Sequence, residues 1–457
     1  MNDAAEKENL MTLQQILGMS ESEARELITA NIAVSASDDE EAQTVANYLS
    51  ELLSRTIRWN SAEPTSAQLE ILINTAVRKT SGRPVYVNIS NGALIISLSL
   101  SKANARTQKN HSSLLLLSAC YSAGFALRQL IKTDTIPFPD EIRIDFRELF
   151  GDLAFLEEAV DIGDTFLAGA GAIGNGFVSG LVTFPNLTGQ LTIADDDKVS
   201  RGNLNRCVLF TEADIGKSKA ILLAQYAQAH LPHVNTKAHE LLLSKVPEKA
   251  RGATWLQRLV VGVDSRRTRR SLQREIPREV FDASTTGISE FVLHHNIQPN
   301  TQACMSCIYS QELEELQRER HVADKLGITL EEMVAGYVTK ETAASIKTKY
   351  PTVAESSLVG QAYDTLFKQL CAEGKLTLDG NVQVLAPLAF ISIMSGVYLA
   401  IEFVRRLSGR SQPSYNYWRV SPWTNPNFRL RDTRQRNANC AFCSDSISIR
   451  VAEEIWG

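Results

Sequence analysis

A glycine-rich loop between two apolar segments in the middle of the chain constrains the fold most strongly. The apolar residues 166–168 lead into Gly169, Gly171 and Gly174, spaced G-x-G-x-x-G, and a second apolar run from Leu191 ends in three aspartates. In a β-α-β unit the first glycine allows a tight turn, the second lets the backbone approach a phosphate, and the third lets the helix pack closely on the strand. The pattern predicts a nucleotide-binding β-α-β unit, and a dehydrogenase that binds a dinucleotide would also show it.

The composition is typical of a globular protein with two or three domains. The 457 residues are 44% hydrophobic and 22% charged, with a net charge of −5, which gives no general electrostatic reason to bind nucleic acid. The best candidate for a local basic patch is interpreted as a solvated helix face; its residues are Arg266, Arg267, Arg269 and Arg270. We therefore predict no nucleic-acid partner.

A polar segment at the N-terminus and an apolar segment near the C-terminus bear on localisation. The first ten residues, MNDAAEKENL, are polar and acidic, unlike a secretion signal, so we expect a cytoplasmic protein. The longest apolar stretch, Leu385–Ile401, is interrupted by two serines and a glycine and is short for a bilayer span. It predicts a buried helix, and we expect no membrane association.

Residues 1–160 are expected to form a smaller α/β domain without a phosphate loop. Their apolar periodicity predicts helical segments in the first 55 residues, and then alternating strands and helices before a boundary at Gly151–Gly163. The predicted strands are Thr56–Trp59, Val85–Ile89, Leu94–Leu100 and Ile142–Phe146, and the predicted helices are Ala67–Val77 and Leu114–Ile131.

The remainder of the chain is expected to form a doubly wound parallel sheet. Strand and helix signals alternate from Thr165 onward, and the apolar run Leu259–Val263 ends in Asp264, as a buried parallel strand with a carboxylate at its carboxyl end would. We assign residues 161–310 to the first part of this domain and 385–457 to its second part. Residues 311–384 are polar and helical, and they predict a helical insertion or crossover segment.

Cationic side chains follow the glycine loop in an order that hydride transfer does not require. Asn205, Arg206 and Lys219 come after the aspartates. Adenylation of a carboxylate places growing negative charge on the α-phosphate and on the departing pyrophosphate, so it needs cations and Mg²⁺ around a triphosphate. Arg206 and Lys219 could supply that charge and Asp264 could hold the metal, with Arg269 one helical turn further on. Taken singly, each has a structural alternative as a surface charge or a helix cap.

In combination, these motifs resemble the ThiF/MoeB adenylation domain of ubiquitin-activating enzymes and of the sulfur-carrier adenylating enzymes of thiamine and molybdopterin biosynthesis. The resemblance covers about 165–310 and 385–445 and rests on the three glycines, the aspartates, VSRGNLNR, G-x-x-K at Gly216–Lys219, and VGVDSRRTR. It implies an α/β fold with a Rossmann-like doubly wound adenylation domain, the smaller N-terminal α/β domain and the helical insertion.

The resemblance also implies roles for residues. Asp195 or Asp197 would contact the ribose of ATP, and Asp264 would bind Mg²⁺. Asn205, Arg206 and Lys219 would contact the phosphates. One departure is Cys207, which stands where the family commonly has glutamine after the arginine.

Four of the seven cysteines form two C-x-x-C pairs, Cys304 with Cys307 and Cys440 with Cys443. Two such pairs in a cytosolic chain can form a closed tetrahedral Cys₄ zinc site. For either pair alone, a redox motif is the alternative. Because the resembling family has the same split arrangement, we expect a structural Zn²⁺ that joins the two parts of the adenylation domain.

The other cysteines are candidates for an acyl-accepting thiol or for packing. Cys120 lies in an apolar run and is predicted to be in the core. Cys371 lies between Lys368 and Lys375, whose charges would favour a thiolate, although a helix C-terminus there would disfavour it. An inert packing cysteine remains the alternative for Cys371, and Cys207 is the second candidate.

The resemblance implies an activating enzyme that uses ATP to adenylate the C-terminal glycine of a ubiquitin-like protein. A cysteine, with Cys371 preferred, would form a thioester and pass the protein to a conjugating enzyme. Size and layout fit the activating enzymes of bacterial ubiquitin-like conjugation operons linked to antiphage (antiviral) defence, with residues 1–160 as a degenerate, inactive adenylation-like domain. A homodimer is left open. The alternatives are a sulfur-carrier adenylyltransferase without an obligatory thioester and, more remotely, an NAD-dependent dehydrogenase.

Overall fold

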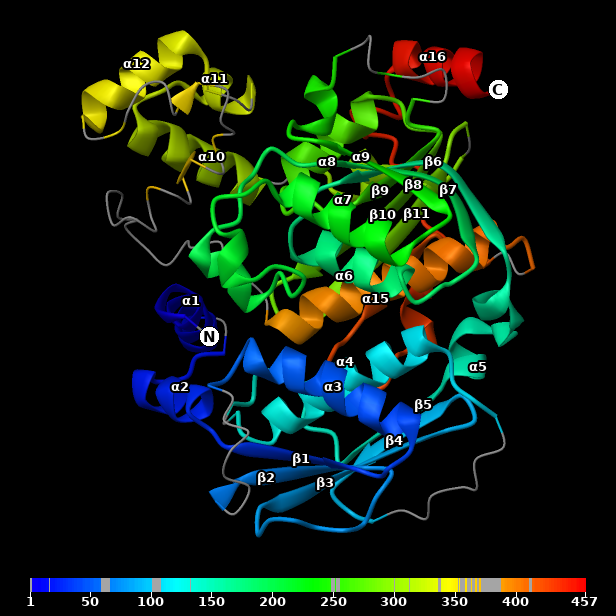
Figure 1. Cartoon of the computed structure of the whole chain (residues 1–457). Coiled ribbons are helices and arrows are strands. Elements are labelled where there is room, and N and C mark those ends of the chain that lie inside the picture. The colour runs from blue at the N-terminus through cyan, green and yellow to red at the C-terminus, as the bar shows by residue number, and fades with distance from the viewer. Residues whose placement is uncertain are drawn as a thin grey trace. The chain divides into compact units, whose positions relative to one another are not determined.

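The protein is described here from a computed structural model of the whole chain (Figure 1). It describes residues 2–15, 17–58, 66–100, 108–131, 133–247, 251, 255–299, 301–311, 313–335, 338–351, 388–410 and 413–457, and isolated positions between 353 and 370. Contacts between residues divide the chain into two compact units. The first comprises residues 1–264, 268–308 and 385–457, and the second comprises 265–267 and 309–384.

A five-stranded sheet forms the N-terminal part of the first unit. Its strands follow in the order β1-β2-β3-β4-β5, parallel from β1 to β3 and antiparallel from β3 to β5. The strands are β1 Ile32–Ala36, β2 Leu69–Ile73, β3 Arg83–Ser90, β4 Ala93–Ser97 and β5 Glu141–Asp145, and the helices are α1 Asp3–Gln15, α2 Glu21–Ile28, α3 Glu40–Ser54, α4 Ser112–Arg128 and α5 Phe146–Phe150.

Two sequence predictions for this part are wrong. The described residues 56–58 of the predicted strand form a turn after α3, and the predicted helix Ala67–Val77 contains strand β2. All five residues of β2 are buried between β1 and β3. A short run of this kind has no solvent-facing side, so its periodicity does not distinguish a strand from a helix. Helices α1, α2 and α3 confirm the helical segments predicted in the first 55 residues, but strand β1, which lies among them, was not predicted.

An eight-stranded sheet forms the other part of the first unit, in the order β13-β12-β11-β10-β9-β6-β7-β8. The strands from β8 to β10 in this order are parallel, and β10 to β13 are antiparallel. Their bounds are β6 Val160–Ala168, β7 Leu187–Ala194, β8 Val234–His239, β9 Arg258–Val261, β10 Glu279–Thr286, β11 Glu290–Ile297, β12 Tyr417–Val420 and β13 Arg431–Asp432.

The parallel strands confirm the predicted doubly wound arrangement. From β6 the chain proceeds outward through β7 and β8, then returns to place β9 on the other side of β6. The strand order therefore reverses between β6 and β9, and ligands of such sheets bind at the carboxyl ends of the strands at this point. The glycine loop follows β6, and Asp264 comes three residues after the end of β9.

Helices cover this sheet and connect it to the N-terminal part. They are α6 Ala172–Leu181, α7 Lys219–His230, α8 Arg266–Arg274, α9 Met305–Ile308, α15 Ala389–Leu407 and α16 Ser446–Trp456, with short 3₁₀ helices η2 Leu153–Glu157, η3 Arg201–Asn205, η4 Glu212–Asp214, η5 Leu243–Lys245 and η7 Phe428–Leu430. Every residue of α15 from Ala389 to Arg406 is buried, which confirms the predicted buried helix. Among the described helices, none combines the length and apolar character needed to cross a bilayer.

The second unit is helical and has its own apolar core. It contains α10 Leu313–Leu326, α11 Leu330–Ala335 and α12 Lys340–Lys349. Leu326, Met333 and Ile346, one from each helix, are buried together with Tyr363. The candidate thiol Cys371 lies outside the described residues.

Helix α15 lies between α6 and α4, as Figure 1 shows for the orange helix near the middle of the view. Glycines let α15 and α6 approach closely, because a Cβ atom added to Gly396 would lie 2.3 Å from the backbone nitrogen of Phe177. On the α4 side, the hydroxyls of Tyr121 and Tyr398 are 2.7 Å apart and fully buried. A continuous apolar core therefore includes both sheets of the first unit.

We expect Gly396→Ala to destabilise the protein by about 3 kcal/mol, because its methyl group would overlap the backbone of α6. Chemical denaturation measures this free energy. The matched control is Ser395→Ala, since the hydroxyl of Ser395 is buried without a hydrogen-bond partner among the described residues, and its removal should cost little or nothing. Equal stability of Gly396→Ala and the wild type would contradict the close helix contact.

Candidate active site

The glycine loop connects β6 to α6 at the point where the strand order reverses. Gly169 has φ +98°, and a Cβ atom on Gly174 would lie 2.2 Å from the carbonyl oxygen of Gly169. At Gly171, the N-cap of α6, an added Cβ would meet no described atom within 4 Å. The first and third glycines thus allow the turn and the close packing, while the second leaves open space at a helix N-terminus, where backbone N–H groups favour an anion.

Asn175, which directly follows the third glycine, holds this loop to the next part of the site. Its Nδ2 donates to the carbonyl oxygens of Ala170 and Gly171 at 3.0 and 2.9 Å. Its Oδ1 accepts a hydrogen bond from the backbone N–H of Leu209 at 3.0 Å. The side chain is fully buried. Sequence analysis missed Asn175, although a polar residue in an otherwise apolar first turn of a helix was a signal for it.

The aspartates after β7 lie beside the same loop. Asp195 accepts hydrogen bonds from the backbone N–H groups of Ala170 at 2.6 Å and Asp197 at 2.8 Å. Burial, together with the charge of Asp197, raises the pKa of Asp195 to about 6, against the opposing effect of Lys219 and the two N–H donors. Asp195 therefore connects the end of β7 to the glycine loop.

Lys219 is brought to the aspartates by hydrogen bonds between two backbone segments. Its backbone N–H donates to the carbonyl oxygen of Asp197 at 3.1 Å. Two residues further along the first segment, the N–H of Val199 donates to the carbonyl oxygen of Lys217, and the carbonyl oxygen of Val199 accepts from the N–H of Gly216, both at 2.9 Å. The Nζ of Lys219 lies 2.8 Å from Oδ2 of Asp197, and the lysine is 6% exposed. Burial disfavours its charge, but the attraction of Asp197 and Asp195 is larger and raises the pKa of Lys219. A buried, permanent cation thus lies at the end of β7.

Arg206 follows η3 and has its guanidinium held by three acceptors. Its Nη1 donates to Oε2 of Glu8 at 2.6 Å, to Oδ1 of Asn205 at 2.7 Å and to the carbonyl oxygen of Gly202 at 3.3 Å. Burial disfavours the charge, but Glu8 offsets this and, with a smaller contribution from Asp264, raises the pKa of Arg206. Asp264 itself is exposed. Arg206 and Asp264 therefore lie within electrostatic range of one another at the carboxyl edge of the sheet.

Two contacts in this region come from the N-terminal part of the chain and were missed by sequence analysis. Glu8 pairs with Arg206, and Oδ1 of Asn9 accepts a hydrogen bond from Nδ2 of Asn205 at 2.9 Å. Both residues lie on α1, almost 200 residues earlier in the chain. Glu8 and Asn9 are ordinary helix residues in the sequence, so no local signal marked them.

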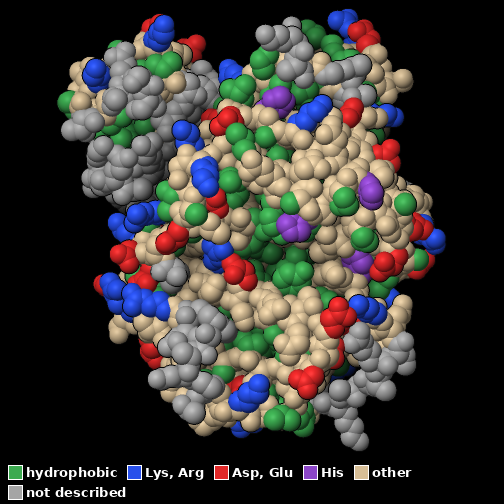
Figure 2. Space-filling model, in the orientation of Figure 1, with side chains coloured by type: hydrophobic (Ala, Val, Ile, Leu, Met, Phe, Trp, Pro, Cys, Tyr) green, Lys and Arg blue, Asp and Glu red, His purple; other side chains and the backbone are tan. Residues whose placement is uncertain are grey.

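The structure corrects the interpretation of the arginine cluster. Arg269 is 2% exposed, and its Nε lies 2.8 Å from Oδ1 of Asp282 on β10. Arg267 contacts Glu319 at 3.4 Å and donates to the carbonyl oxygen of Met333. These arginines have buried or half-buried acceptors and do not form a solvated face. On the face of the molecule seen in Figure 2, basic and acidic side chains are interspersed.

The cysteines outside the two C-x-x-C pairs differ in environment. Cys120 is fully buried in α4, which confirms the predicted core position. Cys207 is 2% exposed, and burial raises the pKa of its thiol in spite of the nearby charges of Arg206 and Lys219. These conditions disfavour a thiolate at Cys207.

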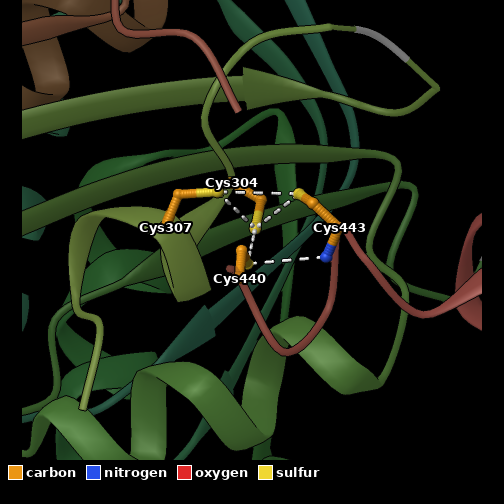
Figure 3. Close-up of side chains that lie close together, drawn as sticks. All are labelled: Cys304, Cys307, Cys440 and Cys443. Carbon is orange, nitrogen blue, oxygen red and sulfur yellow. Dashed lines mark hydrogen bonds between the residues drawn. The ribbon is translucent and has the colours of Figure 1, made fainter. Parts of the chain in front are cut away.

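Cys304, Cys307, Cys440 and Cys443 come together although 136 residues separate equivalent members of the two pairs (Figure 3). Four sulfur–sulfur distances lie between 3.4 and 3.7 Å. A disulfide would require about 2.05 Å. A tetrahedral zinc site with Zn–S bonds of about 2.3 Å places its sulfurs about 3.8 Å apart. The donor set and its spacing therefore fit Zn²⁺.

Hydrogen bonds around the four cysteines support a role as zinc ligands. The backbone N–H groups of Asn437 and Cys443 each donate to a cysteine sulfur at 3.4 Å, to Cys307 and Cys440 respectively. Such donors stabilise thiolates. His294 of β11 contacts the carbonyl oxygen of Ala303 through Nε2 at 2.8 Å and so fixes the segment before Cys304.

Comparison with known proteins gives two family matches that together cover most of the chain. The profile of the ThiF family matches residues 154–442, and that of the E1 N-terminal domain matches residues 1–151.

Individual relatives match parts of the chain. An uncharacterized protein, y4jF, of Sinorhizobium fredii is 28% identical over 313 residues, 65% of this chain and 59% of that protein. The NEDD8-activating enzyme E1 catalytic subunit of Saccharomyces cerevisiae is 31% identical over 150 residues, 30% of this chain and 48% of that protein. The chain thus spans less than two thirds of the length of these relatives. A crystal structure of E. coli MccB with MccA aligns with a TM-score of 0.38 and 15% identity, covering 74% of this chain and 76% of that one.

We expect the purified protein to contain about one zinc ion per chain, as measured by plasma mass spectrometry. Cys443→Ser should lose most of this zinc, because three thiolates bind Zn²⁺ less tightly than four. The control is Cys207→Ser, which changes a buried cysteine outside the cluster and should retain the metal. A wild type without zinc, or Cys443→Ser with full zinc, would contradict the assignment.

Proposed function

Because the chain belongs to the ThiF family, we propose that it uses ATP and Mg²⁺ to adenylate the C-terminal glycine of a ubiquitin-like protein. The observation that supports this proposal is the common placement of three features after neighbouring parallel strands of the eight-stranded sheet: the open helix N-terminus at Gly171 after β6, the Lys219–Asp197 pair after β7, and Asp264 after β9. Arg206 is close enough to Asp264 for their charges to interact. A triphosphate needs this combination of N–H donors, two cations and a metal-binding carboxylate.

In the proposed reaction, a carboxylate oxygen of the glycine attacks the α-phosphorus of ATP. The bond from that phosphorus to the bridging oxygen of the β-phosphate breaks, which gives an acyl adenylate and pyrophosphate. Arg206 and Lys219 would stabilise the charge that develops on the phosphates, and Asn205 would donate to a phosphate oxygen. Mg²⁺, held by Asp264, would neutralise further phosphate charge. Asp195 or Asp197 would accept hydrogen bonds from the ribose.

A second step would transfer the acyl group to an enzyme thiol. The sulfur attacks the carbonyl carbon of the acyl adenylate, AMP leaves, and a thioester remains for transfer to a conjugating enzyme. Cys371 is the proposed thiol, since the burial and the raised pKa of Cys207 disfavour the other candidate. A role in a bacterial conjugation operon and a homodimeric state remain predictions from the sequence.

The alternative function is adenylation of a sulfur-carrier protein with no obligatory thioester. Both functions use the same ATP site, so that site does not distinguish them. The candidate thiol Cys371 belongs by its position in the chain to the helical unit, whose described helices have their own apolar core, and this favours the version with a thioester. The dehydrogenase interpretation gains no support from the family matches.

For the adenylation step, we expect Lys219→Ala and Arg206→Ala each to lower ATP–pyrophosphate exchange at least about 100-fold, because each removes a cation from the developing phosphate charge. The assay contains a candidate ubiquitin-like protein with a free C-terminal glycine. The control is Lys217→Ala, whose exposed side chain pairs with Asp214 and should be dispensable. Full exchange by Lys219→Ala would refute the proposed site.

For the thioester step, we expect a covalent adduct with the ubiquitin-like protein that a reductant cleaves. Cys371→Ala should abolish the adduct and keep pyrophosphate exchange, since adenylation precedes attack by the thiol. Non-reducing gel electrophoresis measures the adduct, with Cys207→Ala as the control. Loss of the adduct in Cys207→Ala, with retention in Cys371→Ala, would reverse the assignment, and no adduct in the wild type would favour the sulfur-carrier alternative.

A further inference from the structure

The segment that carries the proposed phosphate ligands is held by the N-terminal part of the chain from two sides. On one side is α1, whose Glu8 and Asn9 contact Arg206 at 2.6 Å and Asn205 at 2.9 Å. Asn9 is itself fixed, because it is 1% exposed and its Nδ2 donates to the carbonyl oxygen of Arg55 at 2.8 Å. The position of the Asn205 amide is thus tied to the end of α3.

Arg55, the C-cap of α3, holds the same segment from the other side. Its Nη1 donates to the carbonyl oxygens of Leu204 at 2.9 Å and Phe210 at 3.3 Å, and its Nη2 donates to that of Val208 at 2.9 Å. Three backbone carbonyls that flank Arg206 are therefore bound by one guanidinium. A loop with this many fixed backbone positions needs little reordering when it binds a ligand.

Glu8 restrains the Arg206 side chain without consuming all its donors. A guanidinium has five N–H donors, and within the described residues the hydrogen bonds of Arg206 all start from Nη1. Nε and Nη2 remain for phosphate oxygens. The carboxylate fits closely, since a Cβ atom on Gly202 would lie 2.2 Å from Oε1 of Glu8. Only glycine at 202 leaves room for the carboxylate in this position.

From these contacts we infer that Glu8, Asn9 and Arg55 are positioning residues of the nucleotide site, so that the N-terminal part of the chain sets the ATP affinity of the adenylation part. This inference rests on the proposed function only in taking Arg206 as a phosphate ligand. Glu8 holds Nη1 of Arg206, and the other guanidinium nitrogens bind phosphate. The opposite role, in which Glu8 occupies the arginine and competes with phosphate, predicts opposite effects on affinity.

Isothermal titration of the full chain with ATP and Mg²⁺ tests this inference. We expect Glu8→Gln to raise the Kd for ATP about five- to tenfold, because the ion pair that orients Arg206 becomes a weaker hydrogen bond to a neutral amide. Gly202→Ala should raise it similarly: its methyl group displaces only the flexible end of Glu8, so the fold is retained. The matched control is Glu6→Gln, which removes another α1 carboxylate whose partner is Arg58.

A double-mutant cycle separates positioning from general destabilisation. In an Arg206→Ala background, Glu8→Gln should leave the remaining ATP affinity unchanged. The single variants Glu8→Gln and Gly202→Ala should each unfold within a few degrees of the wild type. A lower Kd in Glu8→Gln would establish competition instead, and an unchanged Kd in both Glu8→Gln and Gly202→Ala would also overturn the inference. If Arg206→Ala itself binds ATP as the wild type does, the proposed nucleotide site fails first, whatever the Glu8 variants do.

Discussion

The close contact of α15 with α6 holds together the parts of the first unit that surround the glycine loop. Helix α15 comes after the helical unit in the chain, yet it packs on the helix that begins at the glycine loop. Gly176 and Gly396 allow this, because side chains at these positions would overlap the backbone of the opposite helix. On its other side, α15 meets α4 through Tyr398. One buried helix thereby fixes the glycine loop and joins the N-terminal sheet to the nucleotide-binding sheet.

Buried hydrogen bonds and ion pairs connect these packed helices to the residues of the candidate site. Asn175 on α6 binds the loop before it and the backbone of Leu209, and Asp195 binds the loop from the end of β7. The cations Lys219 and Arg206 each have a carboxylate partner, Asp197 and Glu8. An unpaired buried cation would be costly, so these carboxylates stabilise the positive charges and hold the two side chains in place. The site is therefore organised before it binds a ligand.

Much of the fold could be predicted because its signals are local. The glycine spacing after β6, the apolar strands β6, β7 and β9, and the aspartates that follow β7 and β9 are each contained in one short segment. Parallel strands bring such ends together. The meeting of the two C-x-x-C pairs was predictable in spite of their long separation, because two such pairs in one chain are typical of a zinc site.

The sequence predictions that were wrong or missing concern contacts between residues far apart in the chain, for which a short segment carries no signal. The acceptors of the α8 arginines, Asp282 and Glu319, come from other elements, so the arginines were mistaken for a solvated face. Glu8, Asn9 and Arg55 meet their partners 149 to 198 residues away. Only the packing of the N-terminal part on the nucleotide-binding part gives these three residues a role.

We propose that ATP binds at the edge where the strand order reverses, between the glycine loop and the segment of Arg206 and Lys219. A crystal structure of the full chain with Mg²⁺ and a non-hydrolysable ATP analogue tests it most directly. We expect the phosphates at the N-terminus of α6 beside Gly171, within hydrogen-bond distance of Arg206 and Lys219, and the metal on Asp264. A nucleotide bound elsewhere, or phosphates turned away from both cations, would show that ATP does not bind at this site.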